Sequence, residues 1–320
     1  MFRVMNNMLR RICTARGGWF SRQDALTAGY SPSELQLRVR RKRWLRLSRD
    51  VYVEPADWPT DETPWDRARR THLLAIRAVT ARLGPDVVVS HQSAAVLHGL
   101  PLWGLDLSRV HVTRTSRRTR SEHTVIVHRS ALEDEETVVI DGVRATTVAR
   151  AVAETAAASS YEVGVVLGDA ALHQRLVSAD DLIATADRFP QWAGSPAARA
   201  AARFADGLSE SVGESRLRVL IVNAGMPKPR LQVVILDENG IVVARVDIFV
   251  GEELAVEFDG EHKYGGSPDA VLAEKWREDR IRARGFGVAR VGWSDLDEPT
   301  RTANRLWSAL GSGRRRATSA

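Results

Sequence analysis

Three carboxylates in the C-terminal third of the sequence have the type and spacing for joint chemistry: Asp247, Glu257 and Asp259. Glu257 and Asp259 are two residues apart in a strand-like segment, so both side chains should leave the same face. Counting back from a predicted turn at residues 251–252 places Asp247 opposite Glu257. Converging acids in apolar segments repel one another unless a cation lies between them. Oxygen ligands suit Mg²⁺ or Mn²⁺, so we predict such a site, with acids on a surface strand as the alternative.

The segment that carries these acids is predicted to be an α/β domain with the order α-β-β-β-α-β. An Asn-Gly turn between two segments in which apolar and polar residues alternate favours a hairpin. Farther along, this alternation gives way to a segment rich in charged residues without it, which indicates a helix. The predicted elements are a helix at 210–225, a hairpin at 231–250, a strand at 253–260, a helix near 268–284 and a strand at 285–293.

A basic run near the start of the sequence predicts contact with DNA. It holds seven basic residues and no acid, namely Arg38, Arg40, Arg41, Lys42, Arg43, Arg46 and Arg49. Helix-start patterns at Ser21 and Ser31, after a helix at 3–16, precede a hairpin at 44–53. This order is typical of a winged helix-turn-helix, whose third helix enters the major groove. The alternative for the run is a solvated helix face.

The middle of the chain predicts an α/β region followed by an alanine-rich helical region. A helix is expected at 65–83, a hairpin across Asp141-Gly142 and mostly helix over 146–206. His91 and His98 are seven residues apart and could share a helix face. No third ligand stands beside them in the sequence, so we interpret them as packed or hydrogen-bonded histidines rather than metal ligands.

The composition indicates a folded protein of about two domains. The 320 residues are 44% hydrophobic and 27% charged, with a net charge of +6. A single cysteine, Cys13, excludes an internal disulfide and a cysteine metal cluster. No apolar stretch predicts a membrane span or a secretory signal, and we expect a cytoplasmic protein without a membrane partner. The basic end at 312–320 is predicted to be disordered.

Residues 208–296 resemble the Vsr-like (very-short-patch-repair-like) endonucleases of the PD-(D/E)XK nuclease superfamily. The resemblance lies in RVDIFV, LAVEFDG, His262, EKWREDRIRARG and GVARV, in that order. It implies that Asp247 and Glu257 are metal ligands, and that Asp259 stands where the superfamily usually has lysine. The remaining residues it implies are Glu214 on the leading helix, Gln232 on a strand, and His262, Lys263 or Lys275 in the role of the lysine.

Residues 1–55 resemble the winged-helix domain of AbiEi-type antitoxins, and SHQSAAVLHGL resembles the segment that follows it there. The resulting division is 1–55, 56–206, 207–311 and a tail at 312–320. The preferred function is metal-dependent hydrolysis of DNA phosphodiesters. Its rivals are a non-catalytic DNA-binding regulator, such as an antitoxin with a toxin partner and an inactive nuclease fold, and a structural protein whose acids bind an ion.

Overall fold

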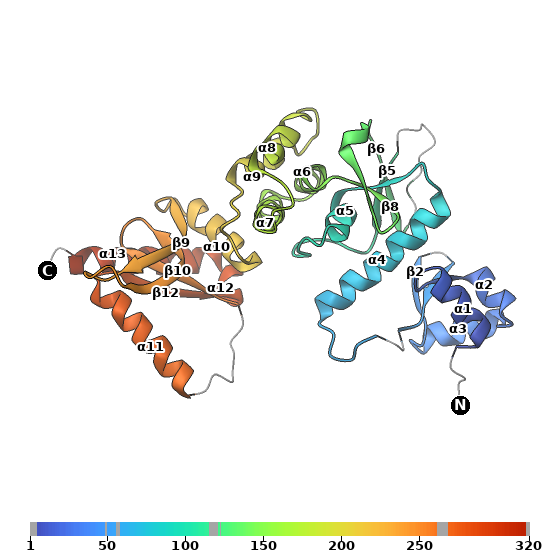
Figure 1. Cartoon of the computed structure of the whole chain (residues 1–320), viewed down its shortest axis with the longest axis horizontal. Coiled ribbons are helices and arrows are strands. Elements are labelled where there is room, and N and C mark those ends of the chain that lie inside the picture. Colours follow the sequence, from blue (N-terminus) through green and yellow to red (C-terminus); the bar gives the residue numbers. More distant parts are fainter. Residues whose placement is uncertain are drawn as a thin grey trace. The chain divides into compact units, whose positions relative to one another are not determined.

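The computed structural model describes residues 5–48, 50–55, 58–114, 121, 123–260 and 268–317 (Figure 1). The chain divides into two compact units. Unit 1 consists of Met1–Ser159 with Ala184–Ala198, and unit 2 consists of Ser160–Ile183 with Arg199–Ala320. Helices and several sheets occur in the described residues, so the predicted α/β class is confirmed.

Unit 1 begins with three helices and a three-stranded antiparallel sheet of order β1-β3-β2. Ser21 and Ser31 each form a capping box, with Asp24 and Glu34 respectively, as the sequence predicted. The fully buried Trp44 centres the small core. The elements are α1 (Asn7–Ala15), β1 (Phe20–Ser21), α2 (Arg22–Thr27), α3 (Pro32–Arg40), β2 (Leu45–Ser48) and β3 (Val51–Val53).

A long helix joins this part to a five-stranded sheet of order β6-β5-β4-β8-β7. The helix packs Ala78 against Val51 and Val53 on one side, and Ile76 and Val79 in the core of the larger sheet on the other. The elements are α4 (Pro64–Leu83), β4 (Val88–Val89), α5 (His91–Leu97), β5 (Val110–Arg114), β6 (Val125–Arg129), a 3-10 turn (Asp134–Glu136), β7 (Thr137–Ile140), β8 (Val143–Thr146) and α6 (Val148–Ala158).

The hairpin between β7 and β8 turns at Asp141-Gly142, as predicted. Both residues have positive φ, 48° and 77°, the conformation that a two-residue turn matching the strand twist requires. The region after β8 is mostly helical, which confirms that prediction too. Its further helices are α7 (Tyr161–His173), α8 (Ala179–Asp187) and α9 (Ser195–Phe204).

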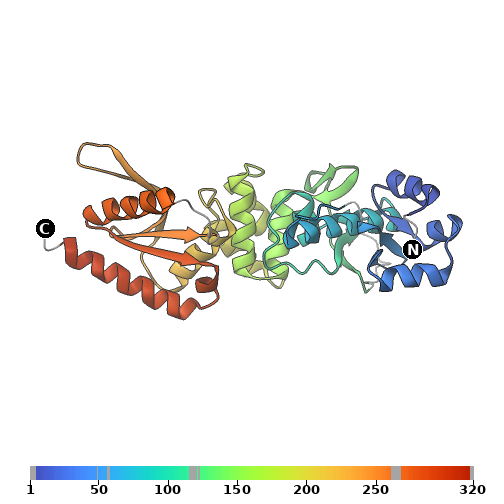
Figure 2. The same cartoon turned by 90° about the horizontal axis from the view of Figure 1, so that it is seen from below.

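Unit 2 contains a four-stranded sheet of order β12-β11-β10-β9, with β11 and β12 parallel and the other pairs antiparallel. Figure 2 shows α11 and α13 on opposite faces of this sheet. Ile281 of α11 belongs to one core, and Leu306 and Leu310 of α13 belong to the other. The elements are α10 (Val212–Asn223), β9 (Pro229–Leu236), β10 (Val242–Val250), β11 (Leu254–Asp259), α11 (Pro268–Ala283), β12 (Gly287–Gly292), α12 (Trp293–Leu296) and α13 (Pro299–Ala317).

Two features of unit 2 differ from the expectations. Helix α13 continues to Ala317 and so includes the first part of the segment 312–320, which the sequence predicts to be disordered. Unit 2 also begins at Ser160 rather than at 207. Arg218 of α10 binds Asp169 of α7 through bonds of 2.6 and 2.8 Å.

Of the described helices, none combines the length and apolar character that a membrane crossing needs.

We predict that the Arg218–Asp169 pair is required for the stability of unit 2. Asp169→Ala leaves a guanidinium that is 5% exposed without its counter-charge, and should lower the free energy of unfolding by about 3–5 kcal/mol. The control is Glu210→Ala, which breaks an exposed 2.9 Å pair with Arg245 and should cost about 1 kcal/mol or less. Urea unfolding of the full chain measures both, and equal decreases would contradict the prediction.

Candidate functional site

The basic run in unit 1 does not present all its charges to solvent. Arg38 is only 6% exposed, because its guanidinium lies 5.0 Å from the ring of Tyr30 and 4.9 Å from that of Trp44. Arg38 is therefore part of the core rather than a side chain free to reach a phosphate. The exposed cations follow at the end of α3 and in β2: Arg40, Arg41, Lys42, Arg43 and Arg46. The predicted contact Arg49 lies outside the described residues.

In unit 2, Glu257 and Asp259 leave the same face of β11, as the spacing predicted. Arg290 of β12 lies 3.8 Å from each of the two carboxylates. Glu257 is buried and accepts two hydrogen bonds from Arg277 of α11, of 2.6 and 2.8 Å. A planar guanidinium matches a carboxylate in this two-point geometry. The charge of Glu257 is thus balanced by arginine.

Asp247 has different partners. One of its oxygens accepts the backbone N–H of Phe258 at 2.9 Å, and its charge contributes to a raised pKa of Glu214. Burial is the largest cause of that raised pKa. Gln232, which the strand register places opposite Asp247, donates to Glu214 at 3.1 Å. The structure therefore groups Asp247 with Glu214 and Gln232.

This arrangement does not fit a magnesium or manganese ion held by Asp247, Glu257 and Asp259 together. Arg277 takes both oxygens of Glu257, and the described acids do not gather in a group of three whose oxygens could share an ion. Lys275 is exposed on α11. His262 and Lys263 lie outside the described residues.

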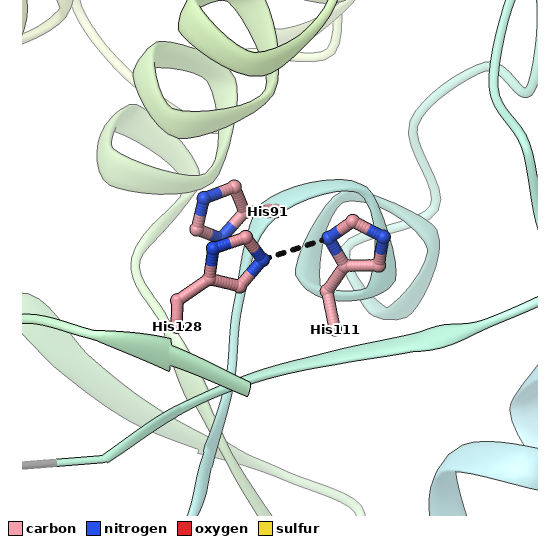
Figure 3. A group of neighbouring side chains, drawn as sticks. All are labelled: His91, His111 and His128. Atoms are coloured by element: carbon pink, nitrogen blue, oxygen red, sulfur yellow. Dashed lines mark hydrogen bonds between the residues drawn. The ribbon is translucent and has the colours of Figure 1, made fainter. Parts of the chain in front are cut away.

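A different group of potential ligands occurs in unit 1. His91, His111 and His128 each offer a ring nitrogen, and these atoms all lie within 4.8 Å of one another (Figure 3). Among the described residues this is the one group of at least three histidine, cysteine, aspartate or glutamate side chains able to share a metal ion. His98 is not a member, because its Nε2 lies 2.8 Å from the carbonyl oxygen of Thr146. The interpretation of His98 as a hydrogen-bonded histidine is confirmed.

The sheet brings two of these histidines together. Strands β5 and β6 are parallel, and Thr113 pairs with His128, so His111, two residues before Thr113, lies on the same face as His128. His111 Nδ1 and His128 Nε2 are 3.0 Å apart. His91 stacks on His128 with ring centroids 3.5 Å apart. Neither His111 nor His128 was predicted from the sequence, although strand alternation in VHV and VHR was a signal that could have found them.

His91 occupies an unusual backbone position at the start of α5. Its φ of 53° lies in the left-handed region, which costs a non-glycine residue about 1–2 kcal/mol. Its backbone N–H donates to Glu154 Oε2 at 3.0 Å, and its Nδ1 lies 3.0 Å from Ser90 Oγ. Glu154 is almost completely buried. These contacts hold the His91 ring over the two strand histidines.

The three rings are neutral near pH 7. Burial is the largest cause in each case: it lowers the pKa of His111 to about 3 and of His128 to about 4, and it depresses the pKa of His91 well below its ordinary value. The neighbouring imidazoles and, for His91, the charge of Arg150 add to the effect. Neutral imidazole is the form that binds metal ions.

The comparisons with known proteins identify relatives of part of the chain. No family model matches it. Part of the chain is similar in sequence to two proteins of Mycobacterium tuberculosis: uncharacterized protein MT2308 of strain CDC 1551 / Oshkosh and uncharacterized protein Rv2248 of strain ATCC 25618 / H37Rv. Each is 33% identical over 115 residues, which make up 35% of this chain and 42% of the relative. The chain thus spans less than half the length of these relatives, whose names state no activity.

Near the cluster, His72 gives a prediction about pH. Its Nδ1 faces the carbonyl oxygen of Leu107 at 3.0 Å, so its Nε2 accepts from Ser93 Oγ at 2.9 Å. Burial lowers its pKa from 6.5 to about 4. The hydrogen bond to the Leu107 carbonyl and the charge of Asp106 act in the opposite direction but are smaller effects. The unfolded chain therefore binds more protons than the folded chain between these values, and stability falls as the pH falls.

From pH 7 to 5.5, His72 should account for a decrease of about 1 kcal/mol in the free energy of unfolding. His72→Gln retains a hydrogen-bonding group without this titration, so the variant should lose less stability over that range. Urea unfolding at pH 7 and 5.5 tests this, with the exposed His173→Gln as the control. Equal acid sensitivity of wild type and His72→Gln would show that the assignment is incorrect.

Proposed function

We propose that this chain binds duplex DNA through residues 7–53 of unit 1. The single observation that carries the proposal is the combination of element order and charge. The order α1-β1-α2-α3-β2-β3, with its sheet order β1-β3-β2, is what a winged helix-turn-helix would have. The exposed cations lie where the third helix ends and the wing begins, the parts of this motif that meet DNA.

The distribution of these cations favours contact with the phosphate backbone. They form a continuous exposed series from Arg40 to Arg43, with Arg46 close by on β2, and no acid interrupts them. Contacts of this kind give affinity and orientation, whereas base edges give sequence preference. The exposed Gln36 and Ser33 on α3 are the polar side chains able to contact bases.

A second candidate function is hydrolysis of DNA phosphodiesters with Mg²⁺ or Mn²⁺ in unit 2. The observation that favours it is Gln232 Oε1, which is buried without a hydrogen-bond partner among the described residues, close to Glu214 and opposite Asp247. The Arg277–Glu257 pair opposes it. Hydrolysis would require Arg277 to release Glu257, whereas a non-catalytic regulator, such as an antitoxin with a toxin partner, would keep the pair.

The DNA proposal predicts a change in salt dependence. Replacing Arg40 and Arg43 with alanine should reduce the slope of log affinity against log salt by about 2, because each arginine that no longer neutralises a phosphate lowers it by about 1. Fluorescence anisotropy with a duplex at several salt concentrations measures the slope. The matched control replaces the exposed Arg129 and Arg144 of the same unit. If both double variants change the slope equally, binding does not depend on the α3 end and the wing.

The hydrolase candidate predicts metal-dependent nicking of supercoiled plasmid. Wild type with Mn²⁺ should nick, and Asp247→Ala should not, while duplex affinity stays within about twofold, or about 0.4 kcal/mol. Retained affinity separates an effect on chemistry from an effect on binding. A wild-type protein that binds DNA and leaves every plasmid intact would rule out the hydrolase and leave the regulator.

A further inference from the structure

We propose that His91, His111 and His128 form a binding site for one divalent transition-metal ion, Zn²⁺, in unit 1. The site is separate from the acids of unit 2 and does not depend on the function proposed above. Its three ligands come from the start of α5 and from the parallel strands β5 and β6 (Figure 3).

The spacing of the nitrogens suits a single ion. Two imidazole nitrogens that bind one zinc tetrahedrally lie about 3.4 Å apart, since each is about 2.1 Å from the metal. His111 Nδ1 and His128 Nε2 are 3.0 Å apart, and the ligand atoms of the three residues all lie within 4.8 Å. If the rings of His111 and His128 move apart by a few tenths of an ångström, an ion can therefore take the place of the hydrogen bond between them.

Binding requires one ring to turn. The rings of His91 and His128 are stacked with an interplanar angle of 15°, and an ion must lie close to the plane of each ring that binds it. His91 stands at the beginning of a helix on a backbone held by Glu154, so its ring can turn about the side-chain bonds without moving a strand, with loss of the contact between its Nδ1 and Ser90 Oγ.

The donor set selects the class of metal. Imidazole nitrogens suit zinc, copper, iron and nickel, whereas Mg²⁺ and Mn²⁺ prefer oxygen. Three histidines leave a fourth position for water or for the carboxylate of Glu154, whose Oε2 lies 3.6 Å from His91 Nδ1. A carboxylate beside a metal-binding histidine also fixes which ring nitrogen carries the proton.

A purely structural histidine cluster is the competing explanation. Such a cluster keeps its His111–His128 hydrogen bond and gains nothing from metal. The two explanations differ in whether zinc stabilises the chain, because a ligand that binds only the folded state raises the free energy of unfolding.

The experiment uses the full chain after treatment with a chelator. Isothermal titration with ZnCl₂ at pH 7 measures affinity, and titration with CoCl₂ followed by visible absorption reports coordination. Wild type should bind, with a raised melting temperature and the intense absorption of four-coordinate Co²⁺. His128→Asn should weaken zinc binding at least about 100-fold, the upper end of what removal of a mere outer-shell partner costs.

Two controls locate the site. His98→Asn replaces a half-buried histidine of the same unit that is outside the cluster, and Asp247→Asn alters the acids of unit 2. Both should bind zinc as wild type does. The proposal is overturned if wild type shows no visible Co²⁺ absorption, a result that needs no variant to fold, or if His128→Asn retains the wild-type affinity.

Discussion

The geometry of unit 1 depends on one buried cation, Arg150. Its side chain is almost completely buried, and a charge in such a place is tolerated only when opposite charges and hydrogen bonds compensate it. Glu154 and Glu136 supply the opposing charges, and Ser130 accepts a further hydrogen bond at 2.9 Å. The guanidinium thereby orients Glu154, whose other oxygen takes the backbone N–H of His91. The position of His91 in the cluster therefore depends on a charge balance between residues far from it in the sequence, Glu154 being 63 residues away.

Other arginines are also buried or paired as part of the structure. Predictions from the sequence are least accurate for these residues. Arg38 lies against aromatic rings, Arg218 pairs with Asp169, and Arg277 holds Glu257. In a sequence these residues cannot be told from solvent-facing arginines, because burial is set by partners far along the chain. The sequence predicts DNA contact for every member of the basic run, although Arg38 belongs to the core. The acids were predicted as a repelling cluster, although arginine compensates Glu257.

Signals carried by neighbouring residues predicted the elements well. The capping patterns at Ser21 and Ser31, the Asp141-Gly142 turn and the hairpin around Asn239 all occur in the structure. Each works because a side chain or a φ value satisfies nearby backbone. What the sequence could not predict is convergence over long separations, such as that of Arg218 with Asp169, which lie 49 residues apart.

The two candidate sites differ in one respect: whether successive side chains of a strand point regularly to opposite faces of the sheet. Between regular parallel strands, alternation correctly brings His111 and His128 together. Around Asp247 the alternation is interrupted, since Val246 and Phe249 contribute to one core while Ile248 between them contributes to the other. Gln232, which the strand register places opposite Asp247, has a φ of 50°. Counting residues therefore predicts shared chemistry only where the residues of a strand keep alternating between the two cores.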